Sequence, residues 1–198
     1  MTSLTALYLA VADALDGPLP IESAARQALL AHAEKAVSVQ PSPLPPTMLD
    51  ILKSKDAHPC CNAIAATPLP WASPQTSDDP RFVELGQQMS LVELVGPDGL
   101  AKSNQIRMGL YGMAPNVDYG VRTHPAEELF VLLAGKSEWL CGDEPFREYV
   151  PGARRHHPSM APHATRTRNS AFMSIYIWTG DISYDDYAYH GAETGAHS

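Results

Sequence analysis

The chain has no excess of basic residues: 14 Lys and Arg stand against 22 Asp and Glu, a formal net charge of −8 over 198 residues. Such a protein offers no positive field that would attract a phosphate backbone, so we expect no nucleic-acid partner. Four arginines do cluster, at positions 154, 155, 166 and 168. We expect them to form ion pairs or a solvated face.

Cysteine is scarce as well. The three cysteines are an odd number, and Cys60 and Cys61 are neighbours that rarely pair, so no disulfide framework is expected. The N-terminal stretch MTSLTALYLAVADALDG has no Lys or Arg ahead of its apolar part, which Asp13 interrupts. It matches neither a signal peptide nor a membrane span, and we expect a cytoplasmic protein without a membrane partner.

The N-terminal quarter has the pattern of helices. Apolar residues recur at three- and four-residue spacing in residues 3–15, and again in residues 21–37, ahead of the proline-rich segment QPSPLPP. Consecutive prolines cannot continue a helix, and Thr47 can cap a short third helix after them. We therefore predict a helical segment over residues 1–57.

The rest of the chain has a different pattern of apolar and turn residues. Residues 58–82 are rich in proline and small side chains without a sustained period, which predicts a long crossing loop. From Val83 onward, short apolar runs such as MSLVELVG, ELFVLLAG and SAFMSIYIWTG alternate with turn residues. Several short strands at this spacing predict an antiparallel sandwich or barrel over residues 83–198, so the fold class is mainly β.

Candidate metal ligands occur in two places. In VRTHPAEELF, residues 121–130, His124 and Glu128 share one face if the segment is a regular strand. The stretch SMAPHATRTRN, residues 159–169, adds His163. Two imidazoles and one carboxylate form a facial set that leaves coordination positions open, as a catalytic metal site requires.

The glycines and prolines around these candidate ligands have the spacing of a known pattern. Two sets of residues resemble the two motifs of the cupin superfamily. The first set is Gly120, His124, Glu128 and Gly135, and the second is Gly152, Pro158, His163 and Asn169. The resemblance implies a single cupin barrel that holds one divalent transition metal ion through His124, Glu128 and His163. Fe(II) and Zn(II) are the leading candidates, with Mn(II) and Ni(II) behind them.

Within the cupins, nearly the whole chain resembles one particular family. The chain is similar to the cupin-type dimethylsulfoniopropionate lyases, above all the DddQ subgroup. The similarity lies in the N-terminal helical segment and in the stretches HPAEELFVLLAGKSEW, HHPSMAPHATRT and WTGDISYDDYAYH. The resemblance implies a carbon–sulfur lyase that splits this small zwitterion into dimethyl sulfide and acrylate. The difficult step is removal of the proton next to the carboxylate, which a metal acting as Lewis acid and a positioned base both promote.

Two residues depart from the family pattern. Arg122 stands where the first motif histidine is usual, and Phe130 stands where a tyrosine serves as ligand or base. Phenylalanine can do neither. Tyr119 resembles another tyrosine of the family's pocket. It is either an ordinary aromatic residue of the barrel wall or the substitute base, and we name it as the candidate for that base. Arg122 either lowers the pKa of that phenol or pairs directly with the substrate carboxylate.

Aromatic residues and a histidine pair complete the candidate site. A sulfonium gains energy over aromatic faces, so we expect Phe130, Trp139, Trp178 and Tyr184 to line the substrate pocket, although core packing is the commoner use of such residues. His156 and His157 are adjacent, so at most one of them points inward from a strand. We expect them to form a loop pair.

Two alternative functions stay open. Three ligands with open positions also suit an Fe(II) oxygenase acting on another small molecule. The third candidate is a non-catalytic cupin that binds a small molecule, with Arg122 in the space of the lost ligand. The sequence leaves the oligomeric state open between monomer and homodimer.

Overall fold

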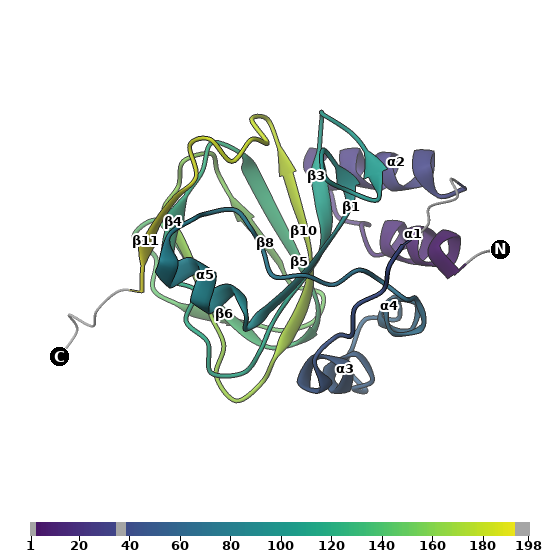
Figure 1. Cartoon of the computed structure of the whole chain (residues 1–198), viewed down its shortest axis with the longest axis horizontal. Helices are drawn as coiled ribbons and strands as arrows, with labels where there is room; N and C mark the ends of the chain where they lie inside the picture. The colour runs from purple at the N-terminus through teal and green to yellow at the C-terminus, as the bar shows by residue number, and fades with distance from the viewer. Residues whose placement is uncertain (1–2, 35–38, 193–198) are drawn as a thin grey trace.

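Two β-sheets face each other as a flattened barrel, and helices cover the outer side of one sheet (Figure 1). The computed structural model describes residues 3–34 and 39–192. The predicted mainly β fold with helices at its N-terminal end is confirmed. Among the described residues, no helix is both long enough and apolar enough to cross a bilayer.

The first two helices lie close to where the sequence places them. They are α1 (Ser3–Asp13) and α2 (Pro20–His32), and α3 (Pro46–Leu52) is the predicted short third helix. The second predicted helix extends too far, because α2 ends at His32, while residues 35–37 lie outside the described residues. Pro20 and Pro46 each stand in the first helical turn, where a missing N–H has no consequence.

The prediction of a continuous loop over residues 58–82 is wrong. The segment contains α4 (Cys61–Ala66) and the start of α5 (Pro80–Gly86), so the first strand begins at Met89 instead of near Val83. Each helix is only six or seven residues long, too short to show a helical period. Burial of Cys61 and Phe82 against the barrel stabilises these helices, and that is a tertiary effect.

The larger sheet has the order β2-β1-β3-β10-β5-β8. Its strands are β1 (Met89–Gly96), β2 (Ala101–Lys102), β3 (Arg107–Met113), β5 (Glu127–Gly135), β8 (Arg154–His157) and β10 (Phe172–Thr179). The smaller sheet has the order β11-β4-β9-β6-β7. Its strands are β4 (Val121–Thr123), β6 (Ser137–Cys141), β7 (Arg147–Tyr149), β9 (His163–Arg166) and β11 (Ala188–Gly191). All pairs are antiparallel except β1 with β2.

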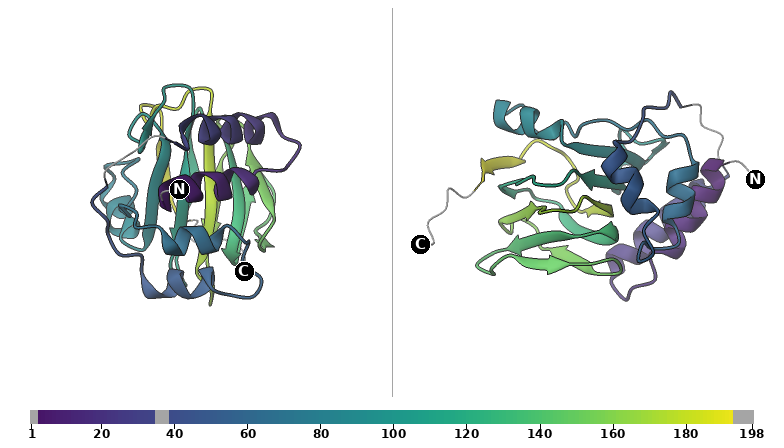
Figure 2. Two further views of the ribbon diagram at one scale, coloured as in Figure 1. Left: turned by 90° about the vertical axis from the view of Figure 1, so that its right-hand side faces the viewer. Right: turned by 90° about the horizontal axis from the view of Figure 1, so that it is seen from below.

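The larger sheet separates two hydrophobic cores. Aliphatic residues of its outer face, such as Leu110 and Ile175, pack with α1 to α4, which Figure 2 shows together on one side of the barrel, apart from α5. Their neighbours Tyr111 and Tyr176 point into the barrel, where aromatic residues form the second core. Strands buried on both faces are continuously apolar, as β10 is. The helices thus leave the inner face free for a site.

The clustered arginines form ion pairs, as one of the two readings of the sequence predicts. Arg155 pairs with Glu144, and Arg166 and Arg168 both pair with Glu138. Arg154 on β8 differs because its partner Glu22, on α2, is fully buried, with an Nε–Oε1 distance of 2.9 Å. This pair joins the helical layer to the edge strand of the larger sheet.

Replacing Arg154 with Met should destabilise the protein by about 3 kcal/mol, because it leaves the Glu22 carboxylate buried without its partner. Urea unfolding measures the change. The matched control is Lys136→Met, which breaks the Lys136–Glu148 pair, whose side chains are both more than half exposed. That change should cost less than about 0.5 kcal/mol. Equal effects in the two variants would contradict a special role for the buried pair.

Candidate metal centre

The stretch VRTHPAEELF is not one regular strand, so the expectation that it presents one face is wrong. It forms all of β4, a bend at residues 124–126 and the start of β5, and it passes from the smaller sheet to the larger one. Pro125 cannot donate to a strand ladder, which favours the break. His124, directly after β4, and Glu128, on β5, converge in the barrel interior.

His124, Glu128 and His163 form a buried group whose ligand atoms lie within 4.8 Å of one another. The Oε2 atom of Glu128 is 3.2 Å from Nε2 of His163 and 3.6 Å from Nε2 of His124. None of the three residues is more than 3% exposed. The structure therefore brings together the ligands that the two motifs suggest.

The orientation of the two imidazoles suits a metal. Nδ1 of His124 donates to the carbonyl of Ala126 at 3.0 Å, and Nδ1 of His163 donates to the carbonyl of Ala161 at 2.8 Å. A carbonyl only accepts, so Nδ1 carries the proton and Nε2 presents a lone pair. Neither Nε2 atom has a hydrogen-bond partner among the described residues. Two lone pairs and a carboxylate oxygen facing one point call for a cation.

The protonation states also fit. Burial raises the pKa of Glu128, but the contacts with His124, His157 and His163 outweigh it and hold that pKa well below its ordinary value. Burial lowers the pKa of His163 from 6.5 to about 3 and that of His157 to about 4. At neutral pH the site thus combines a Glu128 carboxylate with a neutral His163 imidazole, the forms that bind metal.

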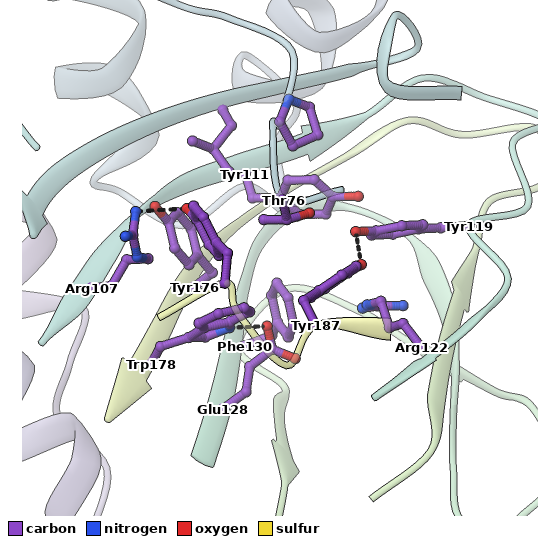
Figure 3. Close-up of a pocket in the computed structure, with 13 residues that line it drawn as sticks. Thr76, Arg107, Tyr111, Tyr119, Arg122, Glu128, Phe130, Tyr176, Trp178 and Tyr187 are labelled. Carbon is purple, nitrogen blue, oxygen red and sulfur yellow. Dashed lines mark hydrogen bonds between the residues drawn. The ribbon is translucent and has the colours of Figure 1, made fainter. Parts of the chain in front are cut away.

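His156 and His157 lie on β8, so the expectation of a loop pair is wrong, while the alternation of the two side chains is as predicted. His157 is fully buried, and its Nδ1 lies 2.9 Å from Oε2 of Glu128. His156 faces outward and contacts Glu127. On the other side, Nε1 of Trp178 donates to Oε1 of Glu128 at 2.6 Å (Figure 3).

A cavity of about 40 Å³ opens beside Glu128, with room for a few water molecules. Its aromatic lining includes the predicted Phe130, Trp178 and Tyr184. It also includes Tyr111, Tyr176 and Tyr187, which sequence reasoning missed. Tyr187 follows the last long strand in a segment without periodicity, and the run of tyrosines in SYDDYAYH was the available clue.

Trp139 does not line this cavity. Its ring lies behind Phe130, with 4.3 Å between ring centroids, and its Nε1 donates to Ser137. The expectation that Trp139 lines the pocket is therefore wrong for this cavity, and the ring on β6 supports that of Phe130 instead.

Arg122 lies beside the metal ligands, paired across the ladder with His163. It is 2% exposed, and its Nη2 donates to Oγ1 of Thr165 at 3.1 Å. The guanidinium carbon stands 4.1 Å from the centre of the Tyr119 ring. Its Nη1 is buried with no hydrogen-bond partner in the described part of the chain, and the residue lines the cavity. An unpaired buried donor of this kind suits an anionic ligand.

Tyr119 has a partner that the sequence did not suggest. Its hydroxyl lies 2.6 Å from that of Tyr187, and both tyrosines line the cavity (Figure 3). Burial raises the pKa of Tyr119, and Arg122 and the hydrogen bond from Tyr187 oppose that rise without cancelling it. Tyr119 is therefore a protonated phenol at neutral pH unless further positive charge reaches it.

An antiparallel barrel with two imidazoles and a carboxylate converging inside it defines a cupin with a candidate metal site. The sequence profile of the dimethylsulfoniopropionate lyase family matches residues 23–174. The chain therefore belongs to this family.

Individual relatives agree with the family assignment. Dimethylsulfoniopropionate lyase DddQ of Ruegeria pomeroyi is 38% identical over 89 residues, which cover 45% of this chain and 44% of that protein, less than half its length. A crystal structure reported for the DMSP lyases RdDddP and RnDddQII has a TM-score of 0.69 at 24% identity, covering 96% of this chain and 98% of that one. DddQ from Ruegeria pomeroyi DSS-3 has a TM-score of 0.59 at 23% identity, covering 88% and 98%. These two likenesses show the fold.

Freshly purified protein should contain about one divalent transition metal ion per chain. His163→Ala should lose most of it, because one of three ligands is gone. Elemental analysis measures the content, and His156→Ala, which changes an outward-facing histidine, should keep it. A parent protein that binds no stoichiometric metal under any loading condition would contradict the site.

The stability of the metal-free protein should fall as the pH is lowered from 7 to 4.5. The pKa values of His157 and His163 are lowered by folding, so the unfolded state takes up protons below about pH 6.5 that the folded state refuses. The lowered pKa of Glu128 acts in the same direction. Tm in the presence of chelator should decrease less steeply in His163→Gln than in the parent. Parallel Tm curves for the two proteins would count against this origin.

Proposed function

We propose that the protein is a metal-dependent carbon–sulfur lyase that splits dimethylsulfoniopropionate into dimethyl sulfide and acrylate. Family membership supports this reaction class, and the observation that carries it is the meeting of His124, Glu128 and His163 beside an aromatic cavity. The bound metal would supply Lewis acidity toward the substrate carboxylate. The other tasks fall to the chain's own side chains.

Arg122 binds the substrate carboxylate in this proposal. Its free Nη1 is a buried donor at the cavity wall, and a carboxylate there completes the hydrogen bonding of the guanidinium. A histidine at this position would be a metal ligand in the family pattern. In this chain a fixed positive charge replaces that ligand, so part of carboxylate binding moves from the metal to the protein.

The sulfonium end lies against aromatic faces, where a cation gains about 0.5 to 2 kcal/mol. Trp178, Tyr176 and Tyr184 provide those faces. Arg107 also lines the cavity and would repel a cation, but its charge is balanced by ion pairs with Glu93 and Asp98. The guanidinium is held over the ring of Tyr184, at 4.1 Å from its centre.

Tyr119 acts as the base. Its phenolate oxygen takes the proton next to the substrate carboxylate, a carbon–carbon double bond forms, and the carbon–sulfur bond breaks with its electron pair leaving on sulfur. Tyr187 donates a hydrogen bond to the phenolate, and Arg122 stabilises its charge. Because burial raises the pKa of Tyr119, the reactive form becomes more abundant at alkaline pH.

A second function has a specific observation behind it. The metal ligands number three and Phe130 contributes none, so the centre has the open positions of an Fe(II) oxygenase. A small-molecule-binding cupin without catalysis is the third candidate. Cytoplasmic location and the choice between monomer and homodimer stay predictions.

Metal-loaded protein mixed with dimethylsulfoniopropionate should release dimethyl sulfide and acrylate in equal amounts, measured by headspace gas chromatography and liquid chromatography. The rate should rise toward alkaline pH, and Tyr119→Phe should lower kcat at least 100-fold, the scale of a general base. Arg122→Met should raise KM, because it removes carboxylate binding, and it should also lower kcat, because the Tyr119 phenolate loses the charge that stabilises it. His156→Ala serves as the control that keeps the parent rate.

Phe130→Tyr separates the candidates. Suppose that the parent protein binds metal but releases no dimethyl sulfide, whereas Phe130→Tyr does release dimethyl sulfide. This chain would then act on another substrate with the same fold and metal site. Oxygen consumption with candidate substrates would then favour the oxygenase. Release of sulfide by Tyr119→Phe at the parent rate would reject Tyr119 as the base while leaving the lyase intact.

A further inference from the structure

The inward side chains of three neighbouring strands form one row at the metal centre. Trp178 on β10 is the cross-strand partner of Glu128 on β5, and Glu128 is the cross-strand partner of His157 on β8. Paired positions on one face of a sheet place side chains in contact. The register of the larger sheet therefore sets Glu128 between an indole and an imidazole.

Each oxygen of Glu128 has its own donor in this row. Trp178 donates from Nε1 to Oε1 at 2.6 Å, and His157 donates from Nδ1 to Oε2 at 2.9 Å. Oε2 is also the oxygen nearest to His124 and His163, so His157 holds the atom at which the ligands converge. Two donors on opposite oxygens fix the plane of the carboxylate, which a single donor would leave free to rotate.

His157 is placed as a donor to a ligand, and its ring geometry opposes direct coordination. Its ring stacks on that of His163, with 4.2 Å between centroids and an interplanar angle of 18°. A metal lies in the plane of each imidazole that binds it, so two nearly parallel stacked rings do not direct lone pairs to one ion. The stacking also keeps the ring of His157 in place.

We propose that His157 is a positioning residue for the metal centre, which orients Glu128 by a hydrogen bond to Oε2. The inference rests on the metal-binding site of the proposed function. It explains how a centre with Arg122 and Phe130 at two usual ligand positions stays formed: with three ligands left, the orientation of each has greater weight. Loss of such a hydrogen-bonding partner typically weakens metal binding by about 10- to 100-fold.

The chain contains a matched control beside the proposed residue. His156 and Glu127 are the neighbours of His157 and Glu128 on the same two strands, and they form the same kind of contact at 2.8 Å. Their side chains are 38% and 49% exposed, on the outer face of the barrel. A change at position 156 therefore removes a histidine–glutamate contact from β8 without touching the centre.

The experiment measures Zn²⁺ affinity by competition with a chromophoric chelator in parent, His157→Phe, His157→Asn and His156→Phe. Phenylalanine keeps a ring against His163 and removes the donor. The amide nitrogen of asparagine takes the place of Nδ1 and keeps the donor, but it loses the ring. The two variants thus separate hydrogen bonding from packing. Tm of each metal-free variant reports whether it folds.

We expect His157→Phe to bind Zn²⁺ about 10- to 100-fold more weakly than the parent protein. The affinity of His157→Asn should stay within about tenfold of the parent value, and that of His156→Phe should equal it. Undiminished affinity in a folded His157→Phe would overturn the proposal. Equal losses in His157→Phe and His157→Asn would also overturn it, because they would indicate a direct ligand or a packing role. If His157→Phe does not fold, His157→Leu takes its place under the same criteria.

The affinity is measured without substrate, so it is independent of the reaction. A parent protein that binds Zn²⁺ with the expected pattern but releases no dimethyl sulfide would refute the lyase and leave His157 as a positioning residue. A parent protein that binds no metal would refute both.

Discussion

The carboxylate of Glu128 is the group on which the rest of the site depends. It is buried inside the barrel, where an ionised group without partners would be strongly destabilising. Two donors provide the compensation, because Trp178 and His157 each donate to one of its oxygens. The lone pairs of His124 and His163 also face the carboxylate, and they add repulsion that a cation would remove. Donors alone satisfy the carboxylate, but only a cation satisfies the carboxylate and the two imidazole lone pairs together. That electrostatic requirement is why the group is a candidate metal site.

The two departures from the family pattern alter the surroundings of the centre more than its ligands. Arg122 adds a permanent positive charge next to His163 and over Tyr119, and it leaves one donor free for an anion in the cavity. Phe130 removes a hydroxyl, and its ring packs between Trp139 and Tyr111 as part of the apolar wall. The Tyr119–Tyr187 pair is then a pair of phenols at the cavity that Arg122 can activate. In the proposed mechanism, charge and proton transfer thus move from the ligand positions to the cavity wall.

The helical layer contributes indirectly. By covering the outer face of the larger sheet, it lets β10 and β5 place aliphatic residues outward and functional residues inward on alternate positions. The Glu22–Arg154 pair ties α2 to β8, the strand that presents His157 to Glu128. Stability and site geometry are therefore linked through one edge strand.

The sequence by itself determined α1 to α3, the mainly β body, the family and the three candidate ligands that the structure brings together, because apolar period, turn residues and motif spacing are local properties. It was wrong about α4 and α5, which are too short for a period and form because the barrel buries Cys61 and Phe82. It was also wrong about the single strand through His124 and Glu128. Only the tertiary structure decided that His157 faces Glu128, that Tyr187 meets Tyr119 and that Trp139 stays behind Phe130. These relations depend on strand register and on which sheets face each other, and no spacing along the chain encodes them.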